Sequence, residues 1–279
     1  MKIFKFKNLN EHICLVKELI STSFLIKGED ATILLGTGMG VFNLKKHIAK
    51  KYDNDLIVVN SHFLPFHSGG NFRFQEVHIG ENDLPTFTKK DEYFKLLDIL
   101  PSVYKENKKL ILLKPLIDKV LKVKKGKTKY EPLKDGDVID LGDRDIIVKD
   151  FPGHTQGSIT LLDEKKKIIY SGDSCSMGFL FFTNPAAKTS EYRETALEYY
   201  SEVKKLGYKK MYSSFISYIP FPNRISFIRD FGKWIGQLTP EQAKIKINVP
   251  GAESELCIAI KSSIRHLMFI CAYWEHQCE

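Results

Sequence analysis

Two groups of short β-rich segments, each followed by a helical pattern, constrain the fold of this chain more than any other feature. The segments are rich in β-branched residues and bounded by polar or turn-forming residues, as strands are. We predict strands at residues 3–6, 13–16, 23–26, 31–35 and 55–60, and then at 138–141, 146–148, 158–162, 168–170 and 210–213. Helices are predicted near 41–48 and at 190–206. Two such halves predict an α/β (α+β) domain with sheets inside and helices outside.

The chain shows neither an internal repeat nor a Pro/Ser-rich linker, so we predict a single domain over residues 1–279. A lysine-rich segment at 85–130 has helical spacing and is expected to be a helical insertion. Residues 218–279 are expected to be a C-terminal helical addition. Within it, the apolar run Leu267–Trp274 indicates a buried helix or an association surface, which leaves a homodimer open.

The net charge of +8 comes from 42 Lys and Arg against 34 Asp and Glu. Its densest part, residues 105–129, has no arginine for base recognition, so we interpret it as a solvated helical face and expect no nucleic-acid partner. No apolar run approaches the ~20 residues of a membrane-spanning helix. The five cysteines are scattered and form no C-x-x-C pair. We therefore expect a cytoplasmic protein with reduced thiols and no membrane partner.

Three loops with metal-ligating side chains each follow a predicted strand. They carry His62 and His67, then His154, then Asp173, and glycines lie beside these residues. Glycine lets neighbouring backbone approach closely, and imidazole and carboxylate groups are common zinc ligands. The loops therefore predict a metal site or a hydrolytic site at the ends of strands.

The order and spacing of these loops resemble the metallo-β-lactamase superfamily of metallo-hydrolases. A Gly-Thr-Gly turn at 36–38 stands where the family has Asp-Thr-Gly, and a histidine loop follows at 61–70. The run Gly-His-Thr-Gln-Gly-Ser at 153–158 and Gly-Asp at 172–173 complete the pattern. The resemblance covers about residues 23–217. It implies a four-layer αββα sandwich with a two-metal site for hydrolysis.

The resemblance implies two metal sites that share Asp173. The first would be held by His62, His154 and the residue at position 64, and the second by His67 and the residues at positions 66 and 215. Large apolar residues stand at those three other positions: Leu64, Phe66 and Phe215. Hydrocarbon side chains offer a metal ion no lone pair, so we expect the family's two-metal mechanism to be lost.

The same departures lead us to interpret the cleft as relined with apolar side chains. Gly36 also replaces the aspartate that supports the site in the family. The expected lining residues are Leu64, Phe66, Phe179, Phe181, Phe182, Phe215 and Gly36. Such a cleft is typical of a small-molecule site, so we expect a small apolar or aromatic ligand and no cofactor. Because the flanking motifs remain intact, we favour an engineered scaffold, and a natural pseudoenzyme is the alternative.

Two alternatives remain for chemistry at this site. In the metal-free one, Cys175 is the nucleophile, His154 or His67 its base and Asp173 the group that orients the imidazole, for hydrolysis of activated esters. Hydroxyl alternatives to the thiol are Ser174, Ser213 and Ser214. In the other, a residual mononuclear zinc-dependent hydrolase survives, with zinc held by His62, His67, His154 and Asp173.

Overall fold

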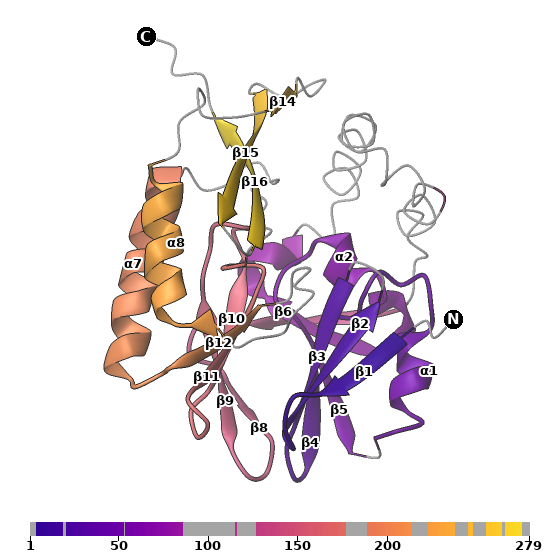
Figure 1. Ribbon diagram of the computed structural model, residues 1–279. Helices are drawn as coiled ribbons and strands as arrows, with labels where there is room; N and C mark the ends of the chain where they lie inside the picture. The colour runs from indigo at the N-terminus through magenta and orange to yellow at the C-terminus, as the bar shows by residue number, and fades with distance from the viewer. Residues whose placement is uncertain are drawn as a thin grey trace.

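Two β-sheets face each other in the computed structural model of the protein (Figure 1). The structure describes residues 4–18, 21–52, 54–85, 115, 127–176, 189–213, 223–237, 245–247, 255–263 and 266–274. Helices cover the outer face of each sheet, which gives a four-layer α/β/β/α arrangement.

The first sheet is built from the N-terminal part of the chain, with seven strands in sequence order. Its strands are β1 (Phe4–Asn8), β2 (Ile13–Glu18), β3 (Ser21–Lys27), β4 (Ala31–Leu35), β5 (Asp55–Asn60), β6 (Glu76–Gly80) and β7 (Lys129–Leu133). Strands β1 to β4 pair antiparallel, whereas β4 to β7 pair parallel. Parallel pairing brings the carboxyl ends of β4 and β5 to the same edge of the sheet.

The second sheet has six strands in the order β13-β12-β11-β10-β9-β8. Its strands are β8 (Val138–Asp140), β9 (Asp145–Asp150), β10 (Ile159–Asp163), β11 (Ile168–Gly172), β12 (Lys210–Ser213) and β13 (Asn223–Arg224). All neighbours are antiparallel except β11 and β12. Helix α7 (Thr189–Lys205) lies between these two parallel strands in the sequence, as the crossover that a parallel connection requires.

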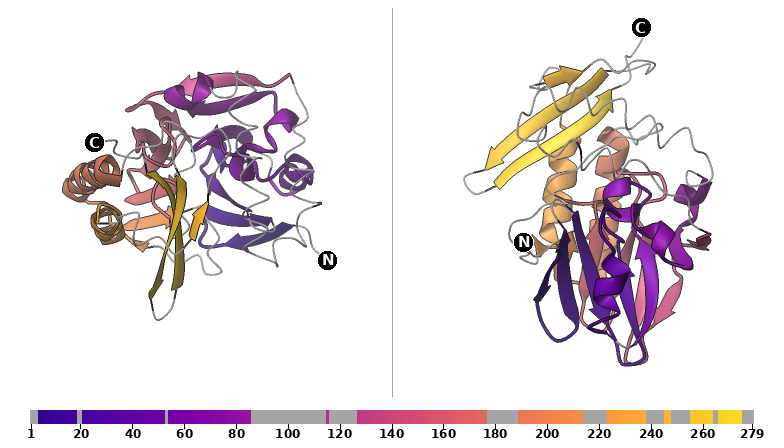
Figure 2. Two further views of the ribbon diagram at one scale, coloured as in Figure 1. Left: turned by 90° about the horizontal axis from the view of Figure 1, so that it is seen from above. Right: turned by 90° about the vertical axis from the view of Figure 1, so that its right-hand side faces the viewer.

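The described helices lie outside the sheets. They are α1 (Leu44–Ile48), α2 (Pro65–Ser68), α7 (Thr189–Lys205) and α8 (Ser226–Ile235), with the short 3₁₀ turns η1 (Asn71–Arg73) and η2 (Glu81–Asp83). Helices α7 and α8 pack side by side on the second sheet (Figure 2). Among the described residues, none of the helices combines the length and the apolar character that crossing a membrane requires.

Strand alternation explains how both faces of the first sheet are buried. Phe24 and Ile26 of β3 belong to the core between the sheets, whereas Leu25 belongs to the outer core that α1 covers. Neighbouring strand residues point to opposite faces, so β3 needs apolar residues on both. Leu44 and Ile48 supply the α1 side of the outer core. Because both faces of the sheet are buried, its central strands are nearly continuous apolar runs, and such runs can be recognised in the sequence.

The predicted strands and helices of both halves agree closely with the structure. The helix predicted at 190–206 is α7, and the strand predicted at 210–213 is β12. Strands β6 and β7 were not predicted, because their sequences, EVHIG and KYEPL, lack a continuous apolar run. The expected lysine-rich helical insertion at 85–130 lies almost wholly outside the described residues.

The C-terminal prediction was wrong in part. Helix α8 lies in the expected helical addition at 218–279, but three antiparallel strands follow it. These are β14 (Ile245–Ile247), β15 (Glu255–Ser263) and β16 (His266–Trp274), which stand beyond the end of the sandwich (Figures 1 and 2). The apolar run in β16 has no periodicity that would distinguish a helix from a strand. It is a strand because β15 pairs with it along its length.

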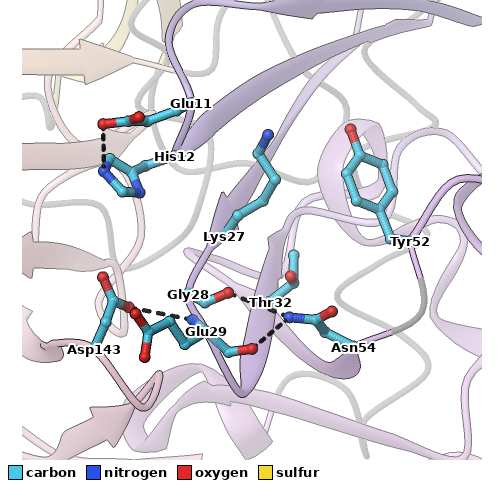
Figure 3. A pocket seen from close by; sticks show the side chains of 9 residues that line it. All are labelled: Glu11, His12, Lys27, Gly28, Glu29, Thr32, Tyr52, Asn54 and Asp143. Carbon is cyan, nitrogen blue, oxygen red and sulfur yellow. Dashed lines mark hydrogen bonds and ion pairs between the residues drawn. The ribbon is translucent and has the colours of Figure 1, made fainter.

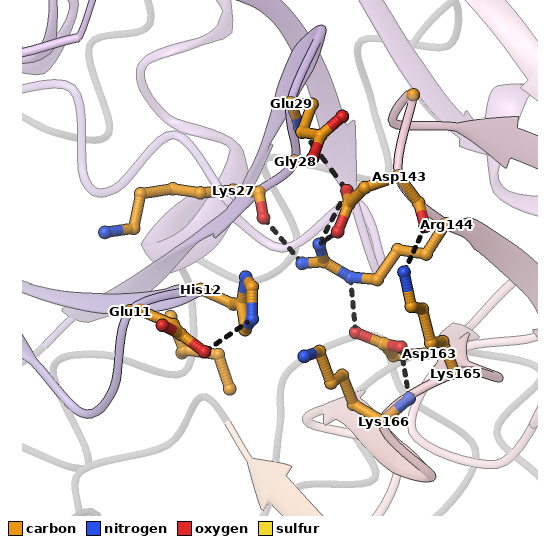
Figure 4. Close-up of polar contacts among 12 residues, drawn as sticks. Glu11, His12, Lys27, Gly28, Glu29, Asp143, Arg144, Asp163, Lys165 and Lys166 are labelled. Atoms are coloured by element: carbon orange, nitrogen blue, oxygen red, sulfur yellow. Dashed lines mark hydrogen bonds and ion pairs between the residues drawn. The ribbon is translucent and has the colours of Figure 1, made fainter.

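A buried guanidinium joins the two sheets at one end of the sandwich (Figure 4). Arg144 lies in the turn between β8 and β9, and its Nε donates to Asp163 Oδ2 at 2.8 Å. One terminal nitrogen donates to both oxygens of Asp143, and the other donates to the carbonyl of Lys27 at the end of β3, at 2.6 Å. Asp163 also accepts from the backbone N–H of Lys166. The guanidinium therefore links one sheet to the other.

We predict that Arg144→Leu lowers the free energy of unfolding by roughly 3–5 kcal/mol, because it leaves the Asp163 carboxylate buried without its charge partner. Urea unfolding near neutral pH measures this change. The control is Arg229→Leu, which removes an exposed pair with Asp230 and should change the free energy of unfolding much less than Arg144→Leu does. Equal effects of the two variants would contradict the role given to Arg144.

Candidate functional site

The four polar residues singled out in the three loops meet at the end of the sandwich opposite Arg144. His62 follows β5, His67 lies in α2, His154 lies in the connection from β9 to β10, and Asp173 directly follows β11. All four side chains are buried. Both sheets contribute, so the site forms only where they pack together.

Three imidazoles face one carboxylate oxygen. His67 Nε2 lies 3.2 Å from Asp173 Oδ2, and His62 Nε2 and His154 Nε2 each lie 3.8 Å from the same atom. The ligand atoms of His62, His154 and Asp173 all lie within 4.8 Å of one another. The site is therefore a group of three clustered ligand atoms, with His67 attached to it through the carboxylate.

Burial and mutual charge set the protonation of this cluster. Burial alone would raise the pKa of the Asp173 carboxyl, but the facing His67, with His62 and His154, lowers it below its ordinary value. Burial lowers the pKa of His62 well below its ordinary value, and the neighbouring His154 lowers it further. The arrangement thus favours a carboxylate facing a neutral His62.

Contacts of Ser61, in the loop after β5, fix the orientation of His62. Ser61 Oγ lies 3.0 Å from His62 Nδ1, so Nε2 is the nitrogen that faces Asp173. The backbone N–H of Ile159 donates to the carbonyl of Ser61 at 2.9 Å. Gly172 has a positive φ of 52°, and a Cβ at this position would collide with Ser61 Oγ. Glycine before Asp173 therefore lets the two loops approach.

The turn at Gly36 holds the backbone of α2. The N–H of Thr37 donates to the carbonyl of His67 at 2.6 Å, and Thr37 Oγ1 donates to Asn71 Oδ1 at 2.7 Å. A Cβ at Gly36 would lie 3.8 Å from His67 Nδ1. Gly36 has a positive φ of 83°, a conformation that residues with a side chain rarely adopt, so glycine suits this turn beside His67.

The fold family implies a metal, and the clustered residues fit one. Zinc–ligand bonds of about 2.0–2.1 Å in a tetrahedron put ligand atoms about 3.3 Å apart. His62 Nε2 and His154 Nε2 each lie 3.8 Å from Asp173 Oδ2, which is slightly wider than this spacing. Within the described part of the chain, His62 Nε2 and Asp173 Oδ1 make no hydrogen bond although they are buried. Buried polar atoms normally have a partner, so these two atoms are suited to a cation and its surroundings.

The residues expected to line an apolar cleft are only partly described. Leu64 is buried and packs with Phe63, Ile79 and Leu84 in a small hydrophobic cluster. Phe66 is half-buried, and its carbonyl accepts from Ser21 Oγ at 2.5 Å. The other expected lining residues, Phe179, Phe181, Phe182 and Phe215, lie outside the described residues. The described part of the predicted lining thus shows Leu64 acting as core.

Cys175 lies in the core cluster beneath α7 rather than at an open surface. Burial raises the pKa of its thiol, although a hydrogen bond from Tyr192 lowers it somewhat. A buried, protonated thiol is a poor nucleophile. Of the hydroxyl alternatives, Ser174 is buried beside Asp173, Ser213 ends β12, and Ser214 lies outside the described residues.

A pocket of about 320 Å³ lies at the opposite end of the sandwich (Figure 3). It is bounded by polar and charged side chains and the turns before β4, β5 and β9. Its lining residues are Glu11, His12, Lys27, Gly28, Glu29, Thr32, Tyr52, Asn54 and Asp143. Because β4 and β5 begin here and end at the histidine cluster, this pocket is separate from the site described above.

Asp83 is a site residue that sequence reasoning missed. It lies in η2, after β6, and its carboxylate accepts from the backbone N–H groups of Phe63 and Gly157 and from Thr155 Oγ1. Burial raises the pKa of Asp83 to about 6, although these hydrogen bonds lower it. An acidic residue in a short connecting turn has no motif spacing, so only the three-dimensional contacts reveal it.

Comparison with known proteins gives a consistent family. The model of the metallo-beta-lactamase superfamily matches residues 16–210. An acyl-coenzyme A thioesterase MBLAC2 from Bos taurus is 26% identical over 190 residues, which cover 61% of this chain and 63% of that protein; the Homo sapiens protein gives the same figures. The chain thus matches less than two thirds of the length of these relatives.

Solved structures share the fold. A metallo-beta-lactamase from Pontibacter korlensis has a TM-score of 0.58 at 12% identity and covers 84% of this chain and 100% of its own. An archaeal superfamily protein from Sulfolobus tokodaii has a TM-score of 0.53 at 17% identity and covers 83% and 86%. These comparisons bear out the expected fold. The sequence relatives are natural vertebrate proteins. The comparisons therefore give no support to the expectation of an engineered scaffold with a dismantled metal site.

We predict that Asp83 makes stability fall as pH rises from about 4 to about 6. The folded-state pKa of about 6 exceeds the ordinary 3.8, so the folded protein binds this proton more tightly than the unfolded chain does. The contribution of this proton to the free energy of unfolding is complete below about pH 4. About 3 kcal/mol of it is lost by pH 7. Urea unfolding of wild type and Asp83→Asn across this range measures it as a change in their stability difference.

The matched control for this titration is Asp230→Asn, which changes an exposed carboxylate paired with Arg229. The stability difference between Asp83→Asn and wild type should change more with pH than the difference between Asp230→Asn and wild type. Equal changes in the two variants would show that Asp83 does not titrate as described.

Proposed function

Because the chain belongs to the metallo-β-lactamase superfamily, we propose that it is a hydrolase that works with one metal ion instead of two. The observation that carries this proposal is the buried cluster of His62, His154 and Asp173. Catalytic zinc sites commonly have three protein ligands and keep one position open. The apolar residues at positions 64 and 66 remove further ligands but leave this set of three intact.

Each polar residue has a role in this proposal. His62, His154 and Asp173 would hold the ion, and Ser61 keeps Nε2 of His62 directed at the cluster. His67 would hold Asp173, whose Oδ2 lies 3.2 Å from His67 Nε2. A bound zinc ion supplies a Lewis acid that polarises a carbonyl and activates water. Because the surrounding side chains are buried, the charges act in a medium that screens them weakly.

A thioester is the substrate class that suits a site with one ion. Hydrolysis adds water to the carbonyl carbon and breaks the C–S bond, giving a carboxylic acid and a thiol. Thiols have a pKa of about 8.5, so the sulfur leaves as a thiolate without a proton donor, whereas an amide nitrogen needs one. The similarity to the acyl-coenzyme A thioesterases named MBLAC2 supports the same class. We therefore propose acyl thioester hydrolysis.

The competing hypothesis is a metal-free protein that binds a small apolar molecule or uses Cys175, as the sequence first suggested. The buried thiol with its raised pKa weighs against Cys175 as a nucleophile. A metal-free cluster would also keep His62 Nε2 and Asp173 Oδ1 buried without a hydrogen bond from the described residues, which costs roughly 1–3 kcal/mol for each group. The cytoplasmic location stays a prediction under either hypothesis.

We predict that the purified protein holds about one zinc ion per chain, measured by inductively coupled plasma mass spectrometry after removal of loosely bound metal. His154→Ala should lose most of it, because only two of the three clustered ligands remain. His78→Ala is the control, since His78 pairs with Glu76 on the outside of the site. Two ions per chain, or none, would contradict the single-ion site.

We predict that the zinc-loaded protein hydrolyses a medium-chain acyl-coenzyme A but not the matching amide or a β-lactam. Thiol release is followed with Ellman's reagent. His154→Ala should lower kcat/KM at least about 100-fold and His78→Ala should leave it near wild type. If thioester hydrolysis survives in His154→Ala, the reaction does not use this cluster. Zinc-loaded protein that does not hydrolyse the thioester would leave the metal site standing and refute the substrate class.

A further inference from the structure

The carboxylate of Asp83 lies between the two loops that carry His62 and His154. Its Oδ2 accepts from the N–H of Phe63 at 3.0 Å and from Thr155 Oγ1 at 2.7 Å. Its Oδ1 accepts from the N–H of Gly157 at 2.8 Å. Each donor is one to three residues from a histidine of the cluster. One side chain thus binds both loops, which belong to different sheets.

The carboxylate occupies this place in spite of an unfavourable environment. Asp83 is 1% exposed, and the three described donors to it are uncharged. A neutral side chain would avoid the desolvation of a carboxylate, but an asparagine amide has one accepting oxygen and could not accept from both N–H groups through two oxygens. The three donors need two acceptor atoms, so Asp83 does more than fill space between the loops: it connects them by hydrogen bonds.

Close packing fixes the position of Asp83 relative to the His154 loop. A Cβ at Gly157 would collide with the backbone N of Asp83, so only glycine lets η2 reach the His154 loop. Thr155 is held in turn by Ser158, whose Oγ accepts from the N–H of Thr155 at 3.0 Å and lies 2.7 Å from Thr155 Oγ1. A movement of Asp83 would therefore move both loops.

We infer that Asp83 is a positioning residue that holds the His62 and His154 loops at the separation a metal ion needs, an inference that rests on the proposed function. It touches neither the ion nor the substrate. Its effect is on how closely the two imidazoles converge before a metal arrives. Partners that orient metal ligands typically contribute about 10- to 100-fold to metal affinity.

The test compares Asp83→Asn with Asp163→Asn in metal-free protein. Asp163 is an equally buried carboxylate that accepts from Arg144 and from the Lys166 N–H at the opposite end of the sandwich (Figure 4). Zinc affinity is measured by competition with a chromophoric chelator, and unfolding is followed on the same samples. We expect Asp83→Asn to bind zinc about 10- to 100-fold more weakly, and Asp163→Asn to lose stability while its zinc affinity stays within about twofold of wild type.

The variant Thr155→Val and the imidazole NMR signals provide two further tests of the positioning role. Thr155→Val removes one of the three hydrogen bonds, should weaken zinc binding less than Asp83→Asn, and should add little to it in the double variant. Long-range ¹H–¹⁵N spectra of the metal-free protein report the imidazole nitrogens directly. Asp83→Asn should shift the signals of His62 and His154 and leave those of the distant His12 and His47 in place.

The outcomes separate the two proposals. If wild type binds no zinc, the single-ion hydrolase is refuted, and the imidazole signals alone then decide whether Asp83 positions the rings. Unchanged imidazole signals and unchanged zinc affinity in a folded Asp83→Asn would overturn the positioning role. An equal loss of zinc affinity in Asp163→Asn would also overturn it, because general destabilisation would then explain the effect.

Discussion

The convergence of three imidazoles on Asp173 Oδ2 is the constraint on which the arrangement of this end of the molecule depends. The histidines come from the loop after β5, from α2 and from the β9–β10 connection, and the carboxylate follows β11. None of these segments can form the cluster by itself, because the ligands lie far apart in sequence and on two sheets. The core between the sheets therefore does more than stabilise the fold. It sets the distances at which the polar groups meet.

The loop that carries His62 and His67 also contributes to the core. Leu64 packs in a small core cluster with Phe63 and Ile79. The backbone of the loop is held independently, since Ser68 Oγ donates to the carbonyl of Phe63 and Thr37 binds the carbonyl of His67. Ligand identity and loop geometry are thus separate properties of this segment.

The sequence predicted much of the fold because the strand pattern and the motif order both depend on local residues. Strands such as β4 and β5 are continuous apolar runs between polar ends, and the structure bears them out. The four polar residues of the cluster were identifiable from the spacing of the family's motifs, and the structure brings them together. The C-terminal strands were mistaken for helix because pairing between β15 and β16, not local pattern, determines them.

Other features could not be predicted because they depend on contacts between distant segments. Asp83 lies in a turn without a motif, and its partners are 20 to 74 residues away in sequence. The expected engineered origin rested on the ligand changes alone, which cannot distinguish design from divergence, and the comparisons do not support it.

The buried guanidinium of Arg144 has a consequence for how this protein can evolve. It joins the sheets at the end remote from the histidines, so this link between the sheets needs no metal ion, whereas small zinc-folded domains depend on their metal. Substitutions among the ligands can then accumulate without unfolding the chain. A scaffold of this kind can explore reduced or altered metal sites while selection for a folded protein is still satisfied.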